Sequence, residues 1–494
     1  ENIESAEATI AIPEADGPEE PVELLPPTGL KMEHQEDKLT ISWKAPTTSE
    51  LLTNYTIRIS PGFEPISTEE TSHVLDEIEN GKTYTATIVA NYDTGENIES
   101  AEATIAIPEA DGPEGPHEDT NGVLFSIGTL TDAVGGQKAS ADFWPSNTAL
   151  NQLNMGVLGD LGTGKTQFLK ALIYQLREET KLHQEKPVSF LILDYKKDYI
   201  KDDFLDAVGG VRLDPEQIPL DLFQIEGEKT SLKVNQKAKA FIDVLDKIYG
   251  GTGPVQQGRL LEVLTELIKK SDTSITMNQV FEHYKEANDG KLDSVSGILQ
   301  NFVYGETFSE NKSELKTMSE LMENNVVVLN LGELGTDQDQ KNALVALFLN
   351  QYYEYMLKLP KHPYRGTDPQ LRTLNSFLLV DEAVGIMKYK FDVLMTLLTQ
   401  AREFGVGVIL SSQYLSHFNQ SGSVDYKEPL LTWAIHKVPD VSEKQLNGLG
   451  INAATKEMAE KISSLPTHHA FYKSLNYEGR FIEGTPFFKL VNGQ

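Results

Sequence analysis

The feature that most constrains this chain is a glycine-rich segment at residues 159–166, GDLGTGKT. A short apolar run, NMGVL at 154–158, precedes it, and an amphipathic stretch follows it at 167–176. Glycine lets the backbone turn so tightly that successive N–H groups point inward, and the N-terminus of a helix adds positive potential. The order of strand, glycine-rich turn and helix therefore predicts a loop that binds phosphate groups.

The side chains of this loop predict that the ligand is a nucleoside triphosphate with Mg²⁺. Lys165 is expected to reach the β- and γ-phosphates, and Thr166 is expected to ligate the metal. The other loop residues expected to bind the cofactor are Gly159, Gly162, Thr163, Gly164 and Gln167. A guanine-reading motif would have the form NKxD, and its nearest match, NKSE at 311–314, ends in Glu. The predicted cofactors are therefore ATP and Mg²⁺.

A second segment, SFLLVDEA at 376–383, places two acids directly after an apolar run. Such a run predicts a buried parallel strand, and α/β sheets bind their ligands at the carboxyl ends of these strands. Asp381 is expected to hold Mg²⁺ through a water molecule, and Glu382 to polarise the water that attacks the γ-phosphate. An apolar run before two acids is by itself weak evidence for a metal site. Its occurrence in the same chain as a phosphate loop makes this interpretation stronger.

Three more apolar runs, at 189–194, 326–331 and 406–412, have the length of buried strands. With the two strands already described, they predict a parallel sheet of five strands connected largely by helices, the α/β RecA-like core of a P-loop ATPase. A strand inserted between the loop strand and the acid strand indicates the branch of these ATPases that uses a catalytic Glu. Apolar residues recur at three- and four-residue spacing within 205–320, which predicts a helical insertion.

Two polar residues flank the run at 406–412. Gln413 follows it and either contacts the γ-phosphate or the attacking water, or caps the end of the strand. Arg402 precedes it on or just after a predicted helix, and either pairs with its neighbour Glu403 at the surface or completes the site of a neighbouring subunit. Both residues are retained as candidate catalytic residues.

The N-terminal part of the chain contains a repeat, because residues 1–19 recur without change at 96–114. We expect residues 1–24 to be the remnant of a preceding repeat with its linker, and 25–110 to be one complete module. Within that module, short stretches of alternating apolar and polar residues separated by turns predict an antiparallel β-sandwich. The segment 111–125 begins rich in Pro, Gly and acids, which predicts a linker.

The composition excludes several classes of protein. The chain carries 43 basic and 74 acidic residues, a net charge of −31, and about −22 of this lies in residues 1–120. A globally basic surface for nucleic acid is therefore excluded, whereas a locally basic groove is not. The chain has no cysteine, which excludes disulfide scaffolds and thiolate zinc sites. It also has no apolar run of the roughly 18 residues that a membrane span needs, so no membrane partner is expected.

Residues 25–110 resemble a fibronectin type III domain. The resemblance rests on Pro26-Pro27 at the entry, Trp43 in the second predicted strand and Tyr55 at the start of the third. It implies an all-β sandwich that acts as an acidic spacer or a binding module.

Residues 126–494 resemble the HerA/FtsK superfamily of hexameric translocases. The segments that carry the resemblance are 159–166, 194–196, 326–331, 377–383 and 401–413. The resemblance implies a homo-hexamer that acts on DNA, with Arg402 serving the neighbouring subunit as an arginine finger, although the family's GRKFGVG reads AREFGVG here. HerA-type ATPases called DptH belong to bacterial anti-phage restriction systems, so a nuclease or other defence subunits are expected partners in a cytoplasmic setting.

Three functions fit these features. The first is an ATP-driven DNA translocase or helicase-type motor in DNA processing or anti-phage restriction. The second is a secretion-type ATPase that moves polypeptide, which the acidic composition favours. The third is a nucleotide-controlled scaffold on which the fibronectin-like module recruits a nuclease.

Overall fold

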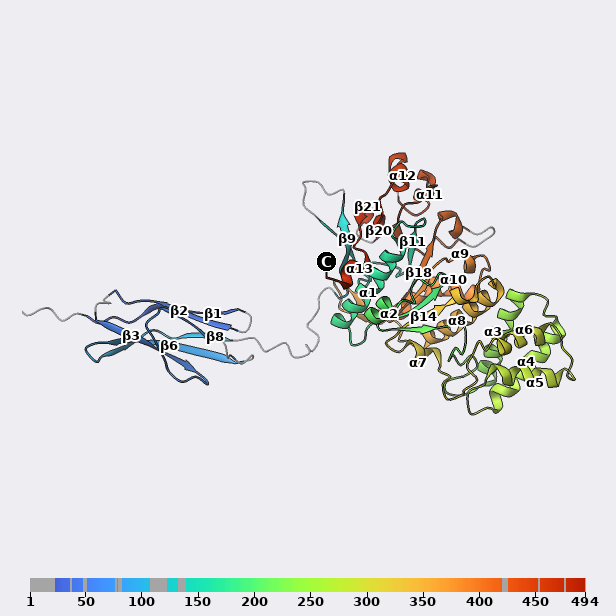
Figure 1. The fold of residues 1–494 in the computed structure, drawn as a ribbon, viewed down its shortest axis with the longest axis horizontal. Coiled ribbons are helices and arrows are strands. Elements are labelled where there is room, and N and C mark those ends of the chain that lie inside the picture. The colour runs from blue at the N-terminus through green and yellow to red at the C-terminus, as the bar shows by residue number, and fades with distance from the viewer. Residues whose placement is uncertain are drawn as a thin grey trace, which may run out of the picture. The chain divides into compact units, whose positions relative to one another are not determined.

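The computed structural model describes most of the chain, and its contacts divide it into two units, residues 1–117 and 118–494 (Figure 1). Most of the predicted repeat remnant and most of the predicted linker lie outside the described residues. The described residues are 23–35, 38–47, 51–75, 78, 82–106, 122–131, 139–419, 425–451, 454–474 and 477–493.

The first unit is an antiparallel β-sandwich. One sheet has the order β1-β2-β5, and the other has the order β4-β3-β6-β7, with β8 also paired to β6. Its strands are β1 Thr28–Gln35, β2 Lys38–Lys44, β3 Leu52–Ser60, β4 Ile66–Thr68, β5 Ser72–Leu75, β6 Thr83–Tyr92, β7 Asn97–Glu99 and β8 Ala103–Ala106. Buried and more exposed side chains alternate along β2 and β3, and the rings of Trp43 and Tyr55 meet edge to face at 5.3 Å in the core. The predicted all-β sandwich is confirmed.

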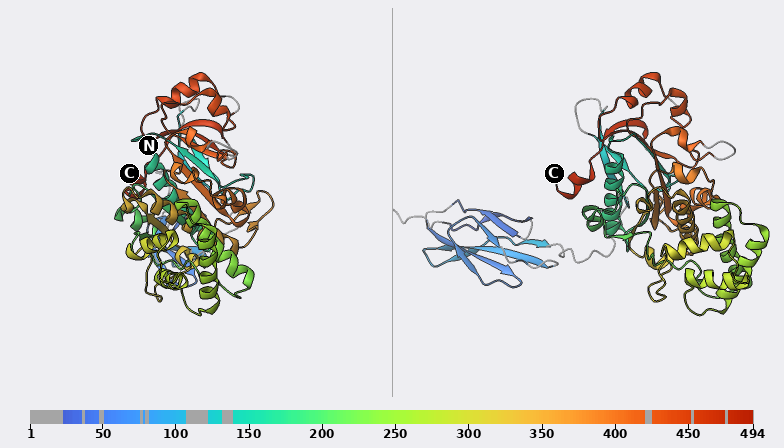
Figure 2. Two further views of the ribbon diagram at one scale, coloured as in Figure 1. Left: turned by 90° about the vertical axis from the view of Figure 1, so that its right-hand side faces the viewer. Right: turned by 45° about the vertical axis from the view of Figure 1, so that its right-hand side comes forward.

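The second unit is built on one sheet of eleven strands, in the order β10-β9-β21-β20-β19-β11-β18-β17-β12-β14-β13 (Figures 1 and 2). The run from β19 to β13 is parallel, and β20, β21, β9 and β10 continue it as antiparallel strands. The strands are β9 Phe125–Leu130, β10 Ser140–Phe143, β11 Met155–Leu158, β12 Ser189–Asp194, β13 Gly210–Leu213, β14 Val326–Asn330, β17 Ser376–Val380, β18 Val406–Ser412, β19 Thr432–Ile435, β20 His469–Ser474 and β21 Tyr477–Glu483. A separate hairpin pairs β15 Tyr364–Arg365 with β16 Leu371–Arg372.

The central strands are covered on both faces. Every residue of β11, β12, β14, β17 and β18 is buried, as the apolar runs in the sequence predict for strands with helices on both sides. Along β12 the side chains alternate between two separate cores: Phe190 and Ile192 face one, Leu191 and Leu193 the other. The first core includes side chains of α1, α2 and α13, and the second those of α8 and α10.

The sheet is larger than the five strands predicted. The parallel part contains two additional strands, β13 and β19, and the four antiparallel strands extend one edge. These additional strands have shorter or less uniformly apolar sequences, since two of the four β13 residues are exposed. The sequence signal of a buried strand is therefore absent in β13, whereas β19 is fully buried but only four residues long. The predicted class, an α/β P-loop core after a β-sandwich, is confirmed.

The helices of the second unit fall into two groups. Helices α3 to α6 contact one another in series, α3 also contacts α8, and together they lie at one end of the unit (Figure 1). The remaining helices cover the sheet and its edges. The bounds are α1 Lys165–His183, α2 Asp202–Val208, α3 Ser231–Tyr249, α4 Pro254–Lys270, α5 Met277–Ala287, α6 Ser294–Tyr304, α7 Met318–Met322, α8 Gln338–Lys358, α9 Val384–Met387, α10 Asp392–Gln400, α11 Glu443–Asn447, α12 Lys456–Ser463 and α13 Phe487–Val491, with 3-10 turns η1 Leu331–Leu334, η2 Ala401–Phe404 and η3 Leu415–Phe418. Across the described parts of the chain, none of these helices has the length and apolar character of a membrane crossing.

Candidate functional site

The phosphate loop joins β11, which ends at Leu158, to α1, which begins at Lys165. Gly162 and Gly164 have φ angles of 73° and 97°, a left-handed conformation that side chains oppose. A Cβ on Gly164 would also lie 2.6 Å from Nδ1 of His468 and 2.9 Å from its backbone N. The glycine at this position is therefore required both by the turn and by the segment packed against it.

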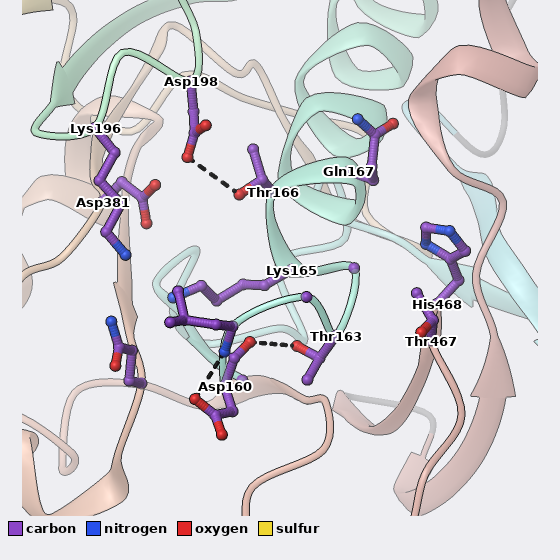
Figure 3. Close-up of a pocket in the computed structure, with 15 residues that line it drawn as sticks. Asp160, Thr163, Lys165, Thr166, Gln167, Lys196, Asp198, Asp381, Thr467 and His468 are labelled. Carbon is purple, nitrogen blue, oxygen red and sulfur yellow. Dashed lines mark hydrogen bonds between the residues drawn. The ribbon is translucent and has the colours of Figure 1, made fainter.

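Hydrogen bonds within and around the loop hold its shape (Figure 3). The Thr163 hydroxyl donates to the carbonyl of Asp160 at 2.8 Å, and the Asp160 carboxylate accepts the N–H of Leu161 at 2.7 Å. The N–H of His468 donates to the carbonyl of Thr163 at 3.0 Å. The loop is thus fixed by its own side chains and by a segment that lies about 300 residues further along the sequence.

A cavity of about 370 Å³ opens above this loop. In Figure 3, Lys196 and Asp381 lie on one side of the loop, and Gln167, Thr467 and His468 lie on the other. The lining residues are Gly159, Asp160, Leu161, Gly162, Thr163, Gly164, Lys165, Thr166, Gln167, Lys196, Asp198, Asp381, Gln413, Thr467 and His468. Its volume is in the range of small-molecule sites in proteins.

The side chain of Lys165 is suited to bind an anion. Its ammonium nitrogen is buried and makes no hydrogen bond to any described residue, and the carboxylate of Glu382 lies 3.6 Å away. Burying an ammonium group without hydrogen-bond acceptors is costly, and phosphate oxygens would supply them. The buried Lys165 nitrogen, without a hydrogen-bond acceptor and beside a glycine-rich loop that lines the cavity, therefore fits the phosphates of a nucleotide.

The two acids stand at the carboxyl end of β17, facing the loop. The Asp381 carboxylate accepts the Ser411 hydroxyl at 2.7 Å, and burial raises its pKa above the usual value despite the nearby charge of Lys165. Glu382 is also partly buried, which acts to raise its pKa, but its hydrogen bond to Lys196 and the charge of Lys165 outweigh burial and lower that pKa. Glu382 is therefore ionised at neutral pH.

Oxygen groups suited to Mg²⁺ lie at the same place. The Thr166 hydroxyl is 3.5 Å from a carboxylate oxygen of Asp198, and Asp381 lines the same cavity. Among the described residues, no cluster of three His, Cys, Asp or Glu side chains is arranged to hold a metal by itself. This donor set fits Mg²⁺, which prefers few carboxylates together with water and substrate phosphates.

Gln413 and Arg402 lie at opposite ends of β18. The Gln413 amide donates to Glu382 at 3.2 Å and lines the cavity. Arg402 lies in η2, before the strand, and donates to the carbonyl and the side-chain oxygen of Asn151 at 2.9 and 3.0 Å. Because the strand has seven residues that rise about 3.3 Å each, Arg402 is roughly 20 Å from the phosphate loop of its own chain.

The partner of Arg402 differs from the surface pairing considered in the sequence. Glu403 forms an ion pair with Lys361 at 3.2 Å, whereas Arg402 binds Asn151. Arg402 is half-buried and lies away from the cavity of its own chain.

Besides Asp160 and Leu161 within the loop, four cavity residues were absent from the predicted site: Lys196, Asp198, Thr467 and His468. Lys196 and Asp198 follow β12 directly, and the rule that ligands bind at the carboxyl ends of parallel strands would have found them. Thr467 and His468 gave no such signal, because they precede an antiparallel strand whose place beside the loop depends on the sheet order.

Comparison with known proteins follows these two units. Residues 126–352 match the family described as helicase HerA, central domain. The second unit therefore resembles HerA-type P-loop ATPases. Residues 25–106 match the fibronectin type III domain, so both resemblances seen in the sequence are confirmed. No relative was found among curated protein sequences.

The second unit was also compared with solved structures. VirB4 of Thermoanaerobacter pseudethanolicus aligns with a TM-score of 0.54 and 14% identity, over 75% of this chain and 98% of that one. The plasmid coupling protein TrwB, solved in complex with ADP and Mg²⁺, aligns with a TM-score of 0.43 and 13% identity, over 69% of this chain and 86% of that one. At these identities the similarity to VirB4 establishes the fold.

Proposed function

We propose that this protein is a Mg²⁺-dependent ATPase that uses hydrolysis to move DNA through a homo-hexameric ring. The observation that carries the proposal is the convergence of Lys165, Thr166 and Asp381 on one cavity, with the Glu382 carboxylate 3.6 Å from the Lys165 nitrogen. We propose DNA as the substrate because residues 126–352 match a family described as a helicase.

Each side chain has a role in this reaction. The loop N–H groups and Lys165 bind the β- and γ-phosphates, and the ionised Glu382 accepts a hydrogen bond from the attacking water and orients it. Mg²⁺, held by Thr166 and through water by Asp381, would neutralise charge on the phosphates. Gln413 fixes Glu382 by its amide hydrogen bond. Gly159, Gly162, Thr163, Gly164 and Gln167 line the phosphate side of the cavity.

The position of Arg402 supports the proposed ring. A transition state for phosphoryl transfer is stabilised by an added positive charge, and an arginine from a neighbouring subunit is a common source of it. Since Arg402 lies at the far end of β18 from its own cavity, it serves the site of the next subunit. A head-to-tail contact of this kind closes into a ring, and we propose six subunits.

A test measures ATP turnover with and without duplex DNA, in wild type and in Lys165→Ala and Glu382→Gln. We expect duplex DNA to stimulate ATP turnover, and we expect this stimulation to weaken as salt weakens DNA binding. Both substitutions and EDTA should abolish turnover. ATP turnover in wild type that does not respond to DNA would instead favour a motor that moves polypeptide. The acidic composition, with 74 acidic and 43 basic residues, also favours that alternative. A Glu382→Gln protein that keeps its full biological effect would favour the nucleotide-controlled scaffold.

The setting is part of the proposal. We place the protein in bacterial DNA processing or DptH-type anti-phage restriction, where the motor would work with a separate nuclease, and dependence on ATP favours the cytoplasm. The proposed domains are a fibronectin module at 25–110, a linker at 111–125 and an ATPase domain at 126–494 with its helical insertion at 205–320. The fibronectin module would recruit the nuclease. Co-purification of a nuclease that is lost when residues 25–110 are deleted tests this role.

A further inference from the structure

The carboxylate of Glu382 is held by more than the phosphate-loop lysine. One of its oxygens, Oε1, is 3.6 Å from Lys165 Nζ and 3.2 Å from the amide nitrogen of Gln413, and Lys196 Nζ forms a close ion pair with the same atom. Only 14% of the Glu382 side chain is exposed. Three groups from three different segments therefore converge on one oxygen atom.

The backbone at Glu382 also shows that its position is imposed. Its φ angle is 57°, in the left-handed region that residues with a Cβ rarely adopt. The adjacent N–H of Ala383 donates to the carbonyl of Ser411 at 2.8 Å, and the Glu382 carbonyl accepts the N–H of Gly385 at 3.2 Å. Surrounding contacts thus keep this residue in a conformation that it would not adopt alone.

When a nucleotide binds, the partners of Glu382 are not equivalent. Lys165 belongs to the phosphate loop, and its ammonium group turns to the β- and γ-phosphates. Gln413 contributes a neutral hydrogen bond. Lys196 is then the charged partner that remains with Glu382, which makes it the group able to fix the carboxylate during hydrolysis.

Lys196 is itself held by a buried carboxylate. Asp194, at the end of β12, is fully buried, and its two oxygens accept the N–H groups of Lys196 at 3.0 Å, Asp198 at 3.2 Å and Tyr199 at 2.8 Å. These hydrogen bonds fix the loop after β12 around the Asp194 side chain. In this loop Lys196 forms an ion pair with Glu382. The next residue, Lys197, instead forms an ion pair with Glu333 at 2.9 Å.

We propose that Lys196 is a positioning residue for Glu382: it holds the carboxylate oriented toward the attacking water while Lys165 is engaged by phosphate. This inference rests on the proposed ATPase function. It assigns Lys196 no direct contact with the nucleotide, and its effect passes through Glu382. The chain supplies a matched control in Lys197, a neighbouring lysine with similar exposure, 43% against 36%, whose partner lies outside the cavity.

The first measurement compares steady-state ATP turnover in wild type, Lys196→Ala, Lys196→Arg and Lys197→Ala. We expect Lys196→Ala to lower kcat at least about tenfold with KM within about twofold, because a displaced carboxylate costs rate rather than binding. Lys196→Arg restores most of the rate, since it keeps the charge. Lys197→Ala stays within about twofold of wild type. Thermal midpoints within about 2 °C of wild type show that each variant is folded.

The second measurement separates positioning from direct contact with phosphate. In a Glu382→Gln background, which does not hydrolyse ATP, the Kd for a fluorescent ATP analogue is measured with and without Lys196→Ala. An unchanged Kd supports the proposal. A Kd that rises about tenfold or more overturns it, because Lys196 would then bind the nucleotide itself.

Failure of the inference and failure of the proposed function give different results. A wild-type protein that turns over ATP, with Lys196→Ala equally active, refutes the role of Lys196 and leaves the ATPase standing. A wild-type protein that binds the analogue and hydrolyses nothing refutes the proposed ATPase, and the role of Lys196 with it.

Discussion

Replacing Lys165 by methionine should separate what this residue does for binding from what it does for folding. Methionine keeps the length and apolar stem of the side chain and removes only the ammonium group. That group is buried and lacks a hydrogen-bond partner among the described residues, so its removal takes away an unfavourable burial. The same change removes one positive neighbour of Glu382, which keeps Lys196.

The magnitudes follow from the distances. At 3.6 Å and an effective dielectric of about 20, the attraction between Lys165 and Glu382 is worth about 4–5 kcal/mol, and burial of the ammonium group costs several kcal/mol in the opposite direction. The two terms nearly cancel, so the thermal midpoint without nucleotide should change by less than about 4 °C. A phosphate oxygen near this nitrogen gains a similar attraction, and losing even about 3 kcal/mol of it weakens binding more than about 100-fold.

The assay combines thermal unfolding with fluorescence anisotropy of an ATP analogue in the presence of Mg²⁺. Wild type should gain thermal stability with nucleotide, whereas Lys165→Met should gain none, because a ligand stabilises only the state that binds it. Lys181→Met, on the exposed side of α1, serves as the control. Binding by Lys165→Met that equals wild type would show that the cavity is not a phosphate site.

Three further predictions follow from the same geometry. Arg402→Ala should keep nucleotide binding and lower DNA-stimulated kcat about 1,000-fold, and adding Lys165→Met subunits, which keep Arg402, should partly restore turnover. Gly164→Ala should abolish binding of the ATP analogue in a folded protein, because its Cβ would meet His468. Burial lowers the pKa of His436 to about 3 in the folded protein, whereas a histidine in the unfolded chain has a pKa of about 6.5. Below about pH 6.5 the unfolded state therefore binds one more proton at this residue than the folded state. The unfolding free energy should then fall by up to about 1.4 kcal/mol per pH unit below 6.5, and calorimetry of His436→Gln should show a smaller slope.

The local parts of the site could be read from the chain. A turn with glycines at 162 and 164 needs only the conformations that glycine permits, and both residues have positive φ. Strands with uniformly apolar sequences, such as β12 and β18, were predicted with the bounds that the structure gives them. Short-range patterns suffice for such elements because each is buried on both faces.

The predicted sheet was too small for a physical reason. In β13 two of four residues are exposed, so its sequence lacks the apolar run that marks a central strand. Antiparallel strands at the edge, such as β20 and β21, join the sheet through pairing with distant segments. Their own patterns do not state which strand they will pair with.

The sequence by itself determined the phosphate loop, the acid-bearing strand and the β-sandwich, because each depends on residues that are neighbours in the chain. The tertiary structure alone decided which distant groups share the cavity. Strand order places Lys196 against Glu382 and packs His468 against Gly164. Those contacts depend on pairings between strands that are far apart in sequence, and only the folded chain brings such segments together.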